Sequence, residues 1–186
     1  MAVTRNFLLS LMLFVATAGF GQQYQLFRIE ENDIYWTNTY QYEGPADSLR
    51  REVVQMLKSK FFTFNVIRNE TGYNGELKHY KVDARKFGRR YTNTPRMYWY
   101  GEWTGKFIVD VSDNNYRVTV YALYAEKFQP SGNNNRGQRI STGRYIEAVT
   151  KKDRVTFKKS EYPNLDLMSL SLKSDFDIRN TVVPNR

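Results

Sequence analysis

The side chains that most often carry catalysis or bind metals are scarce in this chain of 186 residues. His79 is the single histidine and there is no cysteine, which excludes thiol catalysis, thiolate zinc sites and sites with several histidines. The sequence has no G-x-S-x-G, Walker or G-x-G-x-x-G motif. His79 falls within a strand pattern, where a lone histidine is more often a surface or packing residue than a catalyst. We therefore expect no catalytic residue, no metal site and no cofactor.

Two carboxylates near the aromatic centre of the chain offer an alternative. Glu102 and Asp110 could form the carboxylate pair of a glycosidase, with Trp99 and Trp103 stacking on sugar rings. Acidic residues on half-exposed strands are common, however, and tryptophans in a small domain are usually packing residues. The sequence therefore favours a protein that is not an enzyme.

Basic side chains gather in three stretches, each in or beside a predicted turn. Two turns at the same end of a sheet would form a basic rim suited to an acidic partner, whereas turns at different ends would be ordinary solvated charge. The candidate binding rim comprises the basic residues of the first two stretches: Arg85, Lys86, Arg89, Arg90, Arg136, Arg139 and Arg144. The third stretch contains Lys151, Lys152, Arg154, Lys158 and Lys159.

The spacing of apolar residues predicts a strand followed by a helix. Apolar and aromatic residues share one parity over 34–42, a pattern typical of a strand. From 46 to 60, apolar residues recur every three or four positions while charged residues occupy the opposite face. Pro45 suits the first turn of this helix because its missing N–H would have no partner there. We expect an amphipathic helix at this position.

Strand patterns dominate the middle of the chain. Period-two alternation predicts strands over 62–66 and 76–82, joined by a turn at 72–75. Residues 97–103 form an aromatic run that is expected to be extended. Residues 106–124 alternate on both sides of a Ser-Asp-Asn-Asn turn and are predicted to form a β-hairpin.

The last third of the chain combines a loop, two short strands and a helix. Residues 131–139 have no apolar side chain to bury and are expected to be a solvated loop. Short strands are predicted over 144–149 and 154–158. Apolar residues over 165–176 fit helical spacing and in part strand spacing, and Pro163-Asn164 ahead of them favours a helix. The elements together predict a β-rich α+β domain.

The N-terminus has the features of a cleavable secretory signal peptide. One positive charge and no acid precede an apolar stretch over 7–15. Small residues then allow cleavage after Ala18 or after Gly21, and we favour Gly21. The apolar run is about half of the roughly 20 residues needed to cross a bilayer. The sequence predicts a signal peptide over 1–21, a single domain over 22–186 and no transmembrane segment in the mature chain.

Export and charge together define the expected location and partners. Without cysteine, the mature protein has no site for an N-terminal lipid anchor and forms no disulfide. A net charge of +9 with 16% aromatic residues is also typical of nucleic-acid-binding proteins. An exported protein seldom meets nucleic acid, so we expect none as a partner. We expect a periplasmic, outer-membrane-associated or extracellular protein whose partner is an envelope protein or complex, an acidic envelope polymer or lipid headgroups.

Several motifs lie along the predicted domain in a recognisable order. They are the strand Ile34-Tyr35-Trp36 with Tyr40 after it, the helix over 45–60, and the runs over 105–111 and 116–120. Together with the short signal peptide, they resemble a family of exported proteins, common in Bacteroidetes, that carry a domain of unknown function with a TBP-like fold. The resemblance spans most of the predicted domain. It implies a curved antiparallel β-sheet flanked by an N-terminal and a C-terminal helix, and it supplies no activity that could be assigned to this chain.

The favoured function is that of a non-enzymatic exported envelope protein that binds or scaffolds another envelope component. This hypothesis depends on the export signal and on the missing catalytic motifs. The alternative is a carbohydrate-active or cell-wall enzyme that uses strand carboxylates such as Glu102 or Asp110. A nucleic-acid-binding domain would require retention in the cytoplasm and salt-sensitive binding.

Overall fold

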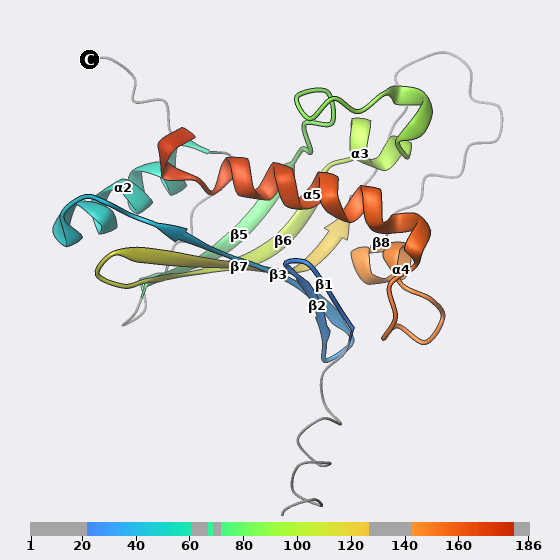
Figure 1. Ribbon diagram of the computed structural model, residues 1–186, viewed down its shortest axis with the longest axis horizontal. Helices are drawn as coiled ribbons and strands as arrows, with labels where there is room; N and C mark the ends of the chain where they lie inside the picture. Colours follow the sequence, from blue (N-terminus) through green and yellow to red (C-terminus); the bar gives the residue numbers. More distant parts are fainter. Residues whose placement is uncertain (1–21, 61–66, 69–71, 127–142, 181–186) are drawn as a thin grey trace, which may run out of the picture.

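The computed structural model describes residues 22–60, 67–68, 72–126 and 143–180 (Figure 1). The predicted signal peptide, the predicted strand over 62–66 and the predicted loop over 131–139 therefore lie outside the described residues. Within the described residues, no helix combines the length and the apolarity needed to cross a membrane.

One antiparallel sheet forms the framework of the molecule. Its strands follow the order β1-β2-β3-β7-β6-β5-β4, and β8 pairs with β7 off this path. The prediction of an α+β fold with a curved antiparallel sheet is confirmed (Figure 1). The strands are β1 Gln23–Tyr24, β2 Phe27–Glu30, β3 Asp33–Gln41, β4 Ile67–Arg68, β5 Gly72–Tyr80, β6 Trp103–Val111, β7 Asn115–Ala125 and β8 Gly143–Arg144.

Two long helices lie on one side of the sheet, and shorter ones complete the structure (Figure 1). The helix α2 confirms the predicted amphipathic helix, and α5 confirms the predicted C-terminal helix. The α-helices are α2 Ala46–Ser59, α3 Arg96–Tyr100, α4 Tyr145–Val149 and α5 Tyr162–Asp175, and the 3-10 helices are Tyr91–Asn93, Lys159–Glu161 and Ile178–Asn180.

The buried face of the sheet holds α5 through aromatic side chains that have polar ends. Trp36 on β3 donates its indole N–H to Ser169 Oγ over 3.0 Å. The Tyr116 hydroxyl on β7 donates to the carbonyl of Phe176 over 2.8 Å. Their rings fill the apolar core while their polar atoms pair with α5 and with the residue that follows it.

The helix α5 is buried on more than one side. Its buried residues occupy neighbouring positions as well as positions one turn apart, a pattern typical of a helix enclosed on several faces; they are Asn164, Leu165, Leu167, Met168, Ser169, Ser171 and Leu172. Leu170 is 45% exposed and lies on the open side of the helix. The chain between β5 and β6 provides the second cover, because Arg89 donates to the carbonyl of Pro163 and Lys86 Nζ donates to Ser174 Oγ over 2.6 Å.

The predicted hairpin over 106–124 is confirmed, since β6 and β7 pair along their length. The predicted strand over 34–42 is confirmed as β3.

The expectation of an extended aromatic run over 97–103 was wrong, because most of that run forms α3. Pro95 precedes the helix, and Tyr98 turns inward to lie 5.5 Å from the ring of Trp103. Tyr98 and Trp103 are buried whereas Trp99 and Tyr100 are partly exposed, so the aromatic content of this run does not indicate a strand.

The predicted turn at 72–75 was also wrong, because these residues are the first part of β5. The glycines allow the next strand to approach closely. A Cβ on Gly72 would lie 1.8 Å from the Val109 carbonyl oxygen, and one on Gly75 would lie 2.5 Å from the Phe107 ring. Glycine in a strand often marks such a close approach. In the sequence alone, these glycines resemble the residues of a turn.

The two short strands that the sequence predicts over 144–149 and 154–158 are both absent. Residues 144–149 contribute the end of β8 and then the single-turn helix α4, whose buried side chains lie one helical turn apart. Residues 154–158 contribute one isolated bridge, between Thr150 and Phe157. One helical turn is too short for periodicity to distinguish it from a strand.

Candidate binding site on the β5–β6 connection

The segment over 81–102, here called the β5–β6 connection, leaves the sheet after β5, passes over α5 and returns as β6 (Figure 1). Buried residues hold it in place, because Val82, Ala84 and Tyr98 are at most 6% exposed. The connection is therefore a fixed part of the molecule that can position side chains on its surface.

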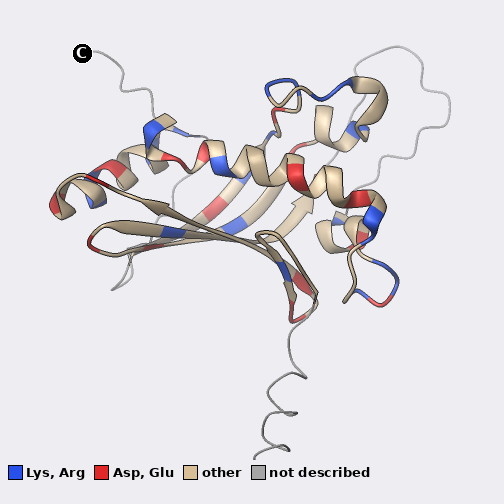
Figure 2. Ribbon diagram, in the orientation of Figure 1, with Lys and Arg blue, Asp and Glu red and all other residues tan. Residues whose placement is uncertain are grey.

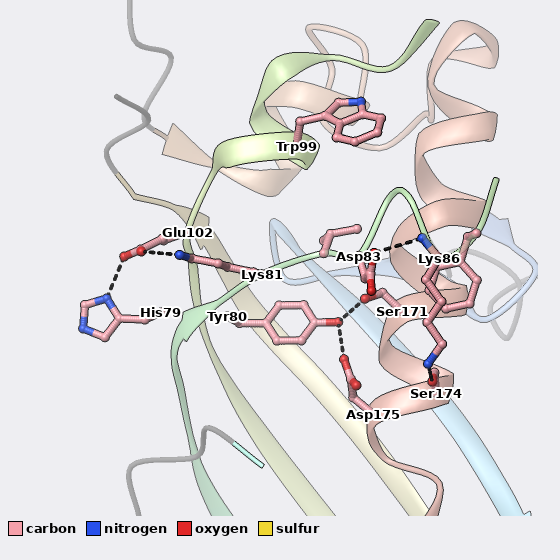
Figure 3. A pocket seen from close by; sticks show the side chains of 12 residues that line it. His79, Tyr80, Lys81, Asp83, Lys86, Trp99, Glu102, Ser171, Ser174 and Asp175 are labelled. Carbon is pink, nitrogen blue, oxygen red and sulfur yellow. Dashed lines mark hydrogen bonds and ion pairs between the residues drawn. The ribbon is translucent and has the colours of Figure 1, made fainter. Parts of the chain in front are cut away.

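A pocket of about 610 Å³ lies between the connection, the end of β5 and α5. We call it the α5 pocket (Figure 3). The aromatic rings of Trp99 and Phe87 contribute apolar surface, and Lys86 contributes a positive charge. Its volume falls within the range of sites for small molecules, roughly 300–1,000 Å³.

A buried hydrogen-bond network forms one wall of the α5 pocket. The Tyr80 hydroxyl is hydrogen-bonded to Ser171 Oγ at 2.7 Å and to Asp175 Oδ2 at 3.1 Å (Figure 3). Lys60 Nζ lies 3.7 Å from Asp175 Oδ1. Burial raises the pKa of the Asp175 carboxyl, although the Lys60 ammonium acts in the opposite direction. Burial also raises the pKa of Tyr80, so its hydroxyl stays protonated.

A second group of charged residues lies at the edge of the pocket. His79 Nδ1 is 2.8 Å from Glu102 Oε2, and Lys81 Nζ is 3.2 Å from Glu102 Oε1 (Figure 3). Hydrogen bonds from His79 and Lys81 lower the pKa of Glu102. Glu126 Oε2 lies 3.9 Å from His79 Nδ1. One ligand atom each from His79, Glu102 and Glu126 falls within 4.8 Å of the others, so these residues could hold a cation.

A bulge in β5 brings His79 to this position. The pairing of β5 with β6 shifts between Leu77 and Tyr80. Within the shift, His79 adopts a φ of 53°, in the left-handed region that few residues other than glycine occupy. The bulge explains why strand parity alone does not place His79 beside Glu102.

A second pocket of about 560 Å³ adjoins the connection and shares Trp99 with the α5 pocket. We call it the Tyr91 pocket. Tyr91 and Tyr100 are both about half exposed, and Arg85 also lines the pocket. The Tyr91 ring lies 6.0 Å from that of Trp99 and 5.8 Å from that of Tyr100. Three rings beside an arginine thus form an aromatic and cationic surface.

The described members of the candidate basic rim fall into two groups with different surroundings. Basic residues of the connection lie on the α5 side of the sheet (Figure 2). Within it, Arg85 and Arg90 are exposed and their side chains have no hydrogen bond or ion pair with any described residue. Arg144 instead donates to the Asn32 carbonyl in the β2–β3 turn. Arg136 and Arg139 lie outside the described residues.

Lys86 and Arg89, the other two rim residues, hold the connection against α5. The structure therefore separates cations that stabilise the fold from Arg85 and Arg90, which are free to meet a ligand. Sequence clustering alone does not make this distinction, because all four residues are basic and adjacent.

The carboxylates considered for glycosidase chemistry are far apart. Glu102 precedes β6 and Asp110 lies near its other end, which puts about 26 Å between them at the usual rise of a strand. Asp110 is bound to Arg117, with 3.0 Å between its Oδ2 and the guanidinium. Carboxylate pairs of glycosidases lie roughly 5–9.5 Å apart. Trp103 is fully buried, so only Trp99 of the two tryptophans can meet a sugar.

Comparisons of the chain with protein-family models, curated proteins and solved structures found no match. The resemblance to an exported family with a TBP-like fold therefore stays a prediction from the sequence. The candidate site is defined here by geometry and charge alone.

Proposed function

We propose that this chain is an exported, non-enzymatic protein of the cell envelope that binds an acidic glycan on the β5–β6 connection. The observation that carries the proposal is the position of Trp99, which lines both pockets, next to Arg85 in one and Lys86 in the other. Aromatic rings therefore lie beside two cations, and one of these, Arg85, has no hydrogen bond or ion pair with any described residue.

The two kinds of side chain match two properties of an acidic glycan. Aromatic rings pack against the apolar C–H faces of sugars, and Tyr91, Trp99 and Tyr100 offer adjoining rings for successive sugar units. Guanidinium groups form paired hydrogen bonds with carboxylates and phosphates, which Arg85 and Arg90 can supply. Envelope polymers carry both features, whereas a neutral glycan would use the rings alone.

Two further features support binding rather than hydrolysis. Glu102 and Asp110, the two carboxylates considered for hydrolysis, lie much farther apart than the carboxylate pair of a glycosidase. The Glu102 carboxylate is already engaged by His79 and Lys81. The predicted signal peptide supports a location in the envelope, where an acidic glycan is present and nucleic acid is not.

Tryptophan fluorescence tests the proposal directly. Trp36 and Trp103 are fully buried, so a ligand on the connection alters the emission of Trp99 first. Soluble peptidoglycan fragments with free peptide carboxylates should change the emission and saturate, and neutral chitooligosaccharides should bind at least tenfold more weakly. The absence of any saturable change with the acidic fragments would reject the proposal.

Matched variants separate specific binding from general charge. The double variant Arg85→Gln/Arg90→Gln should weaken binding by at least tenfold, because it removes the unpaired cations beside the rings. The control Lys151→Gln/Lys152→Gln makes the same change in charge in another exposed turn and should alter the affinity less than twofold. Equal losses in both double variants would point to non-specific electrostatic attraction.

A further inference from the structure

We propose that His79, Glu102 and Glu126 form a binding site for a divalent transition-metal ion, with Zn²⁺ as the best-fitting metal. Imidazole and carboxylate are ligands that zinc accepts readily, and three protein ligands leave a further position open. Zinc can bind here whether or not a glycan occupies the pockets, so metal binding and glycan binding are separate questions.

The distances between the ligand atoms suit one ion. At zinc–ligand distances of about 2.0–2.2 Å, tetrahedral ligands lie roughly 3.3–3.6 Å from one another. His79 Nδ1 lies 2.8 Å from Glu102 Oε2 and 3.9 Å from Glu126 Oε2, and all three ligand atoms fall within 4.8 Å. Small side-chain rotations therefore convert the present arrangement into a coordination site.

The backbone places the three residues on adjoining strands. Trp103 pairs with Tyr80 on one side and with Ala125 on the other, so the residues just beyond this row are neighbours. The amide of Glu126 donates to the carbonyl of Glu102 over 2.7 Å, which continues the ladder from β6 to the end of β7. His79 reaches the same place through the bulge in β5.

The charges of the site favour a bound cation. Glu102 and Glu126 extend from neighbouring strands at the same row, where two like charges destabilise a sheet. Lys81 neutralises one oxygen of Glu102, and Glu126 has no closer partner among the described side chains than His79 at 3.9 Å. A divalent ion between the carboxylates would offset this repulsion.

The site is open to solvent and to the α5 pocket. The His79 side chain is 72% exposed, and His79 and Glu102 both line that pocket (Figure 3). A metal ion held here would keep an open coordination position for water or for an oxygen of a ligand. Metals that require only oxygen ligands, such as Mg²⁺ and Ca²⁺, gain nothing from the imidazole.

The composition of the chain simplifies a test of zinc binding. His79 is the single histidine and there is no cysteine, so no other imidazole or thiolate competes for zinc. Zn²⁺ is titrated into the full chain, purified without a histidine tag, by calorimetry, and the imidazole signals of His79 are followed by NMR. We expect one Zn²⁺ per chain, a shift of the imidazole signals at the same stoichiometry, and at least tenfold weaker binding of Mg²⁺.

Four variants define the ligands. His79→Asn keeps a residue tolerant of positive φ and removes the imidazole, and Glu126→Gln removes one carboxylate; each should weaken zinc binding at least tenfold. The control Glu76→Gln makes the same change in charge as Glu126→Gln, but on β5 outside the site, and should alter the zinc affinity less than twofold. Lys81→Met removes the competing ammonium and should tighten binding.

Two results would reject the proposed zinc site. One is the absence of saturable zinc binding, and the other is a zinc affinity that is unchanged in both His79→Asn and Glu126→Gln. Because Glu126 follows the last residue of β7 and its side chain is partly exposed, Glu126→Gln reports on the metal even if His79→Asn fails to fold.

Discussion

Asp175 at the end of α5 illustrates how one carboxyl can work against the stability of the folded state. Its Oδ2 accepts a hydrogen bond from the Tyr80 hydroxyl and its Oδ1 lies 3.7 Å from Lys60 Nζ, yet burial still raises its pKa above the ordinary value of 3.8. The folded protein therefore holds this proton more tightly than the unfolded chain. The stabilisation is present in full below pH 3.8 and is lost as the pH rises through the raised pKa.

Asp175→Asn should become more stable relative to the wild type as the pH rises from about 3 to 7. The variant keeps an acceptor for Tyr80 but has no charge to bury. Urea unfolding at a series of pH values measures the difference in the free energy of unfolding.

Asp153 provides a control with the opposite sign. Hydrogen bonds from the amides of Val155 and Thr156 lower its pKa, so its stabilisation is present above pH 3.8 and is lost as the pH falls. Asp153→Asn should therefore lose stability relative to the wild type as the pH rises. Parallel pH curves for the two variants would contradict this account.

The sequence could not predict these residue-level environments. Asp175 meets Tyr80 across 95 residues of sequence, and His79 meets Glu102 only because β5 has a bulge. No local pattern encodes either contact. The basic connection, by contrast, was predictable as a cluster, because Arg85 and Arg90 lie close together in the chain.

At the scale of elements, the docking of α5 depends on a few polar contacts within an apolar interface. The hydrogen bond from Trp36 to Ser169 is buried on both sides. Losing the acceptor would leave a buried indole N–H without a partner, which costs about 1–3 kcal/mol.

Ser169→Ala should therefore lower the free energy of unfolding by about 1–3 kcal/mol. In a protein that already carries Trp36→Phe, the loss caused by Ser169→Ala should be smaller by about 1 kcal/mol or more, because the indole N–H donor is no longer there. Chemical denaturation of the single and double variants gives this coupling.

The exposed Leu170 provides the matched control on the same helix. Leu170→Ala should change the free energy of unfolding by about 0.5 kcal/mol or less. Equal losses from Ser169→Ala with and without the indole would mean that the hydrogen bond does not stabilise the docking of α5.

Element prediction succeeded where the pattern of buried residues extended over several turns or along a whole strand. The helices α2 and α5 each extend over 14 residues, and the hairpin of β6 and β7 alternates along both strands. The helices α3 and α4 have only 5 residues each, too few to show a period. The start of β5 was missed because glycines that admit Phe107 resemble turn residues.

At the scale of the whole molecule, the proposed export can be checked at the N-terminus. Gln22, the residue after the favoured cleavage position, donates its amide to the Val155 carbonyl over 3.3 Å, and its Oε1 accepts from the Phe157 amide. Cleavage after Gly21 keeps the hydrogen bond between the Gln22 side chain and the Phe157 amide, and it gives a chain that starts within the domain.

The mass of the protein recovered from the envelope fraction should correspond to a chain that begins at Gln22. A chain that begins at Gly19 would move the cleavage position to Ala18 and leave export intact. An uncleaved chain in the cytoplasm would contradict export.

The position of α5 in the chain has a consequence for synthesis. The sheet buries Trp36 and Tyr116 against α5, yet α5 follows every strand in sequence. A chain leaving the ribosome therefore cannot cover this part of the inner face of its sheet until α5 has been made, and it cannot close its core earlier. Until then the polypeptide has no closed core. That is the state in which a narrow translocation channel accepts a protein, as the proposed export requires.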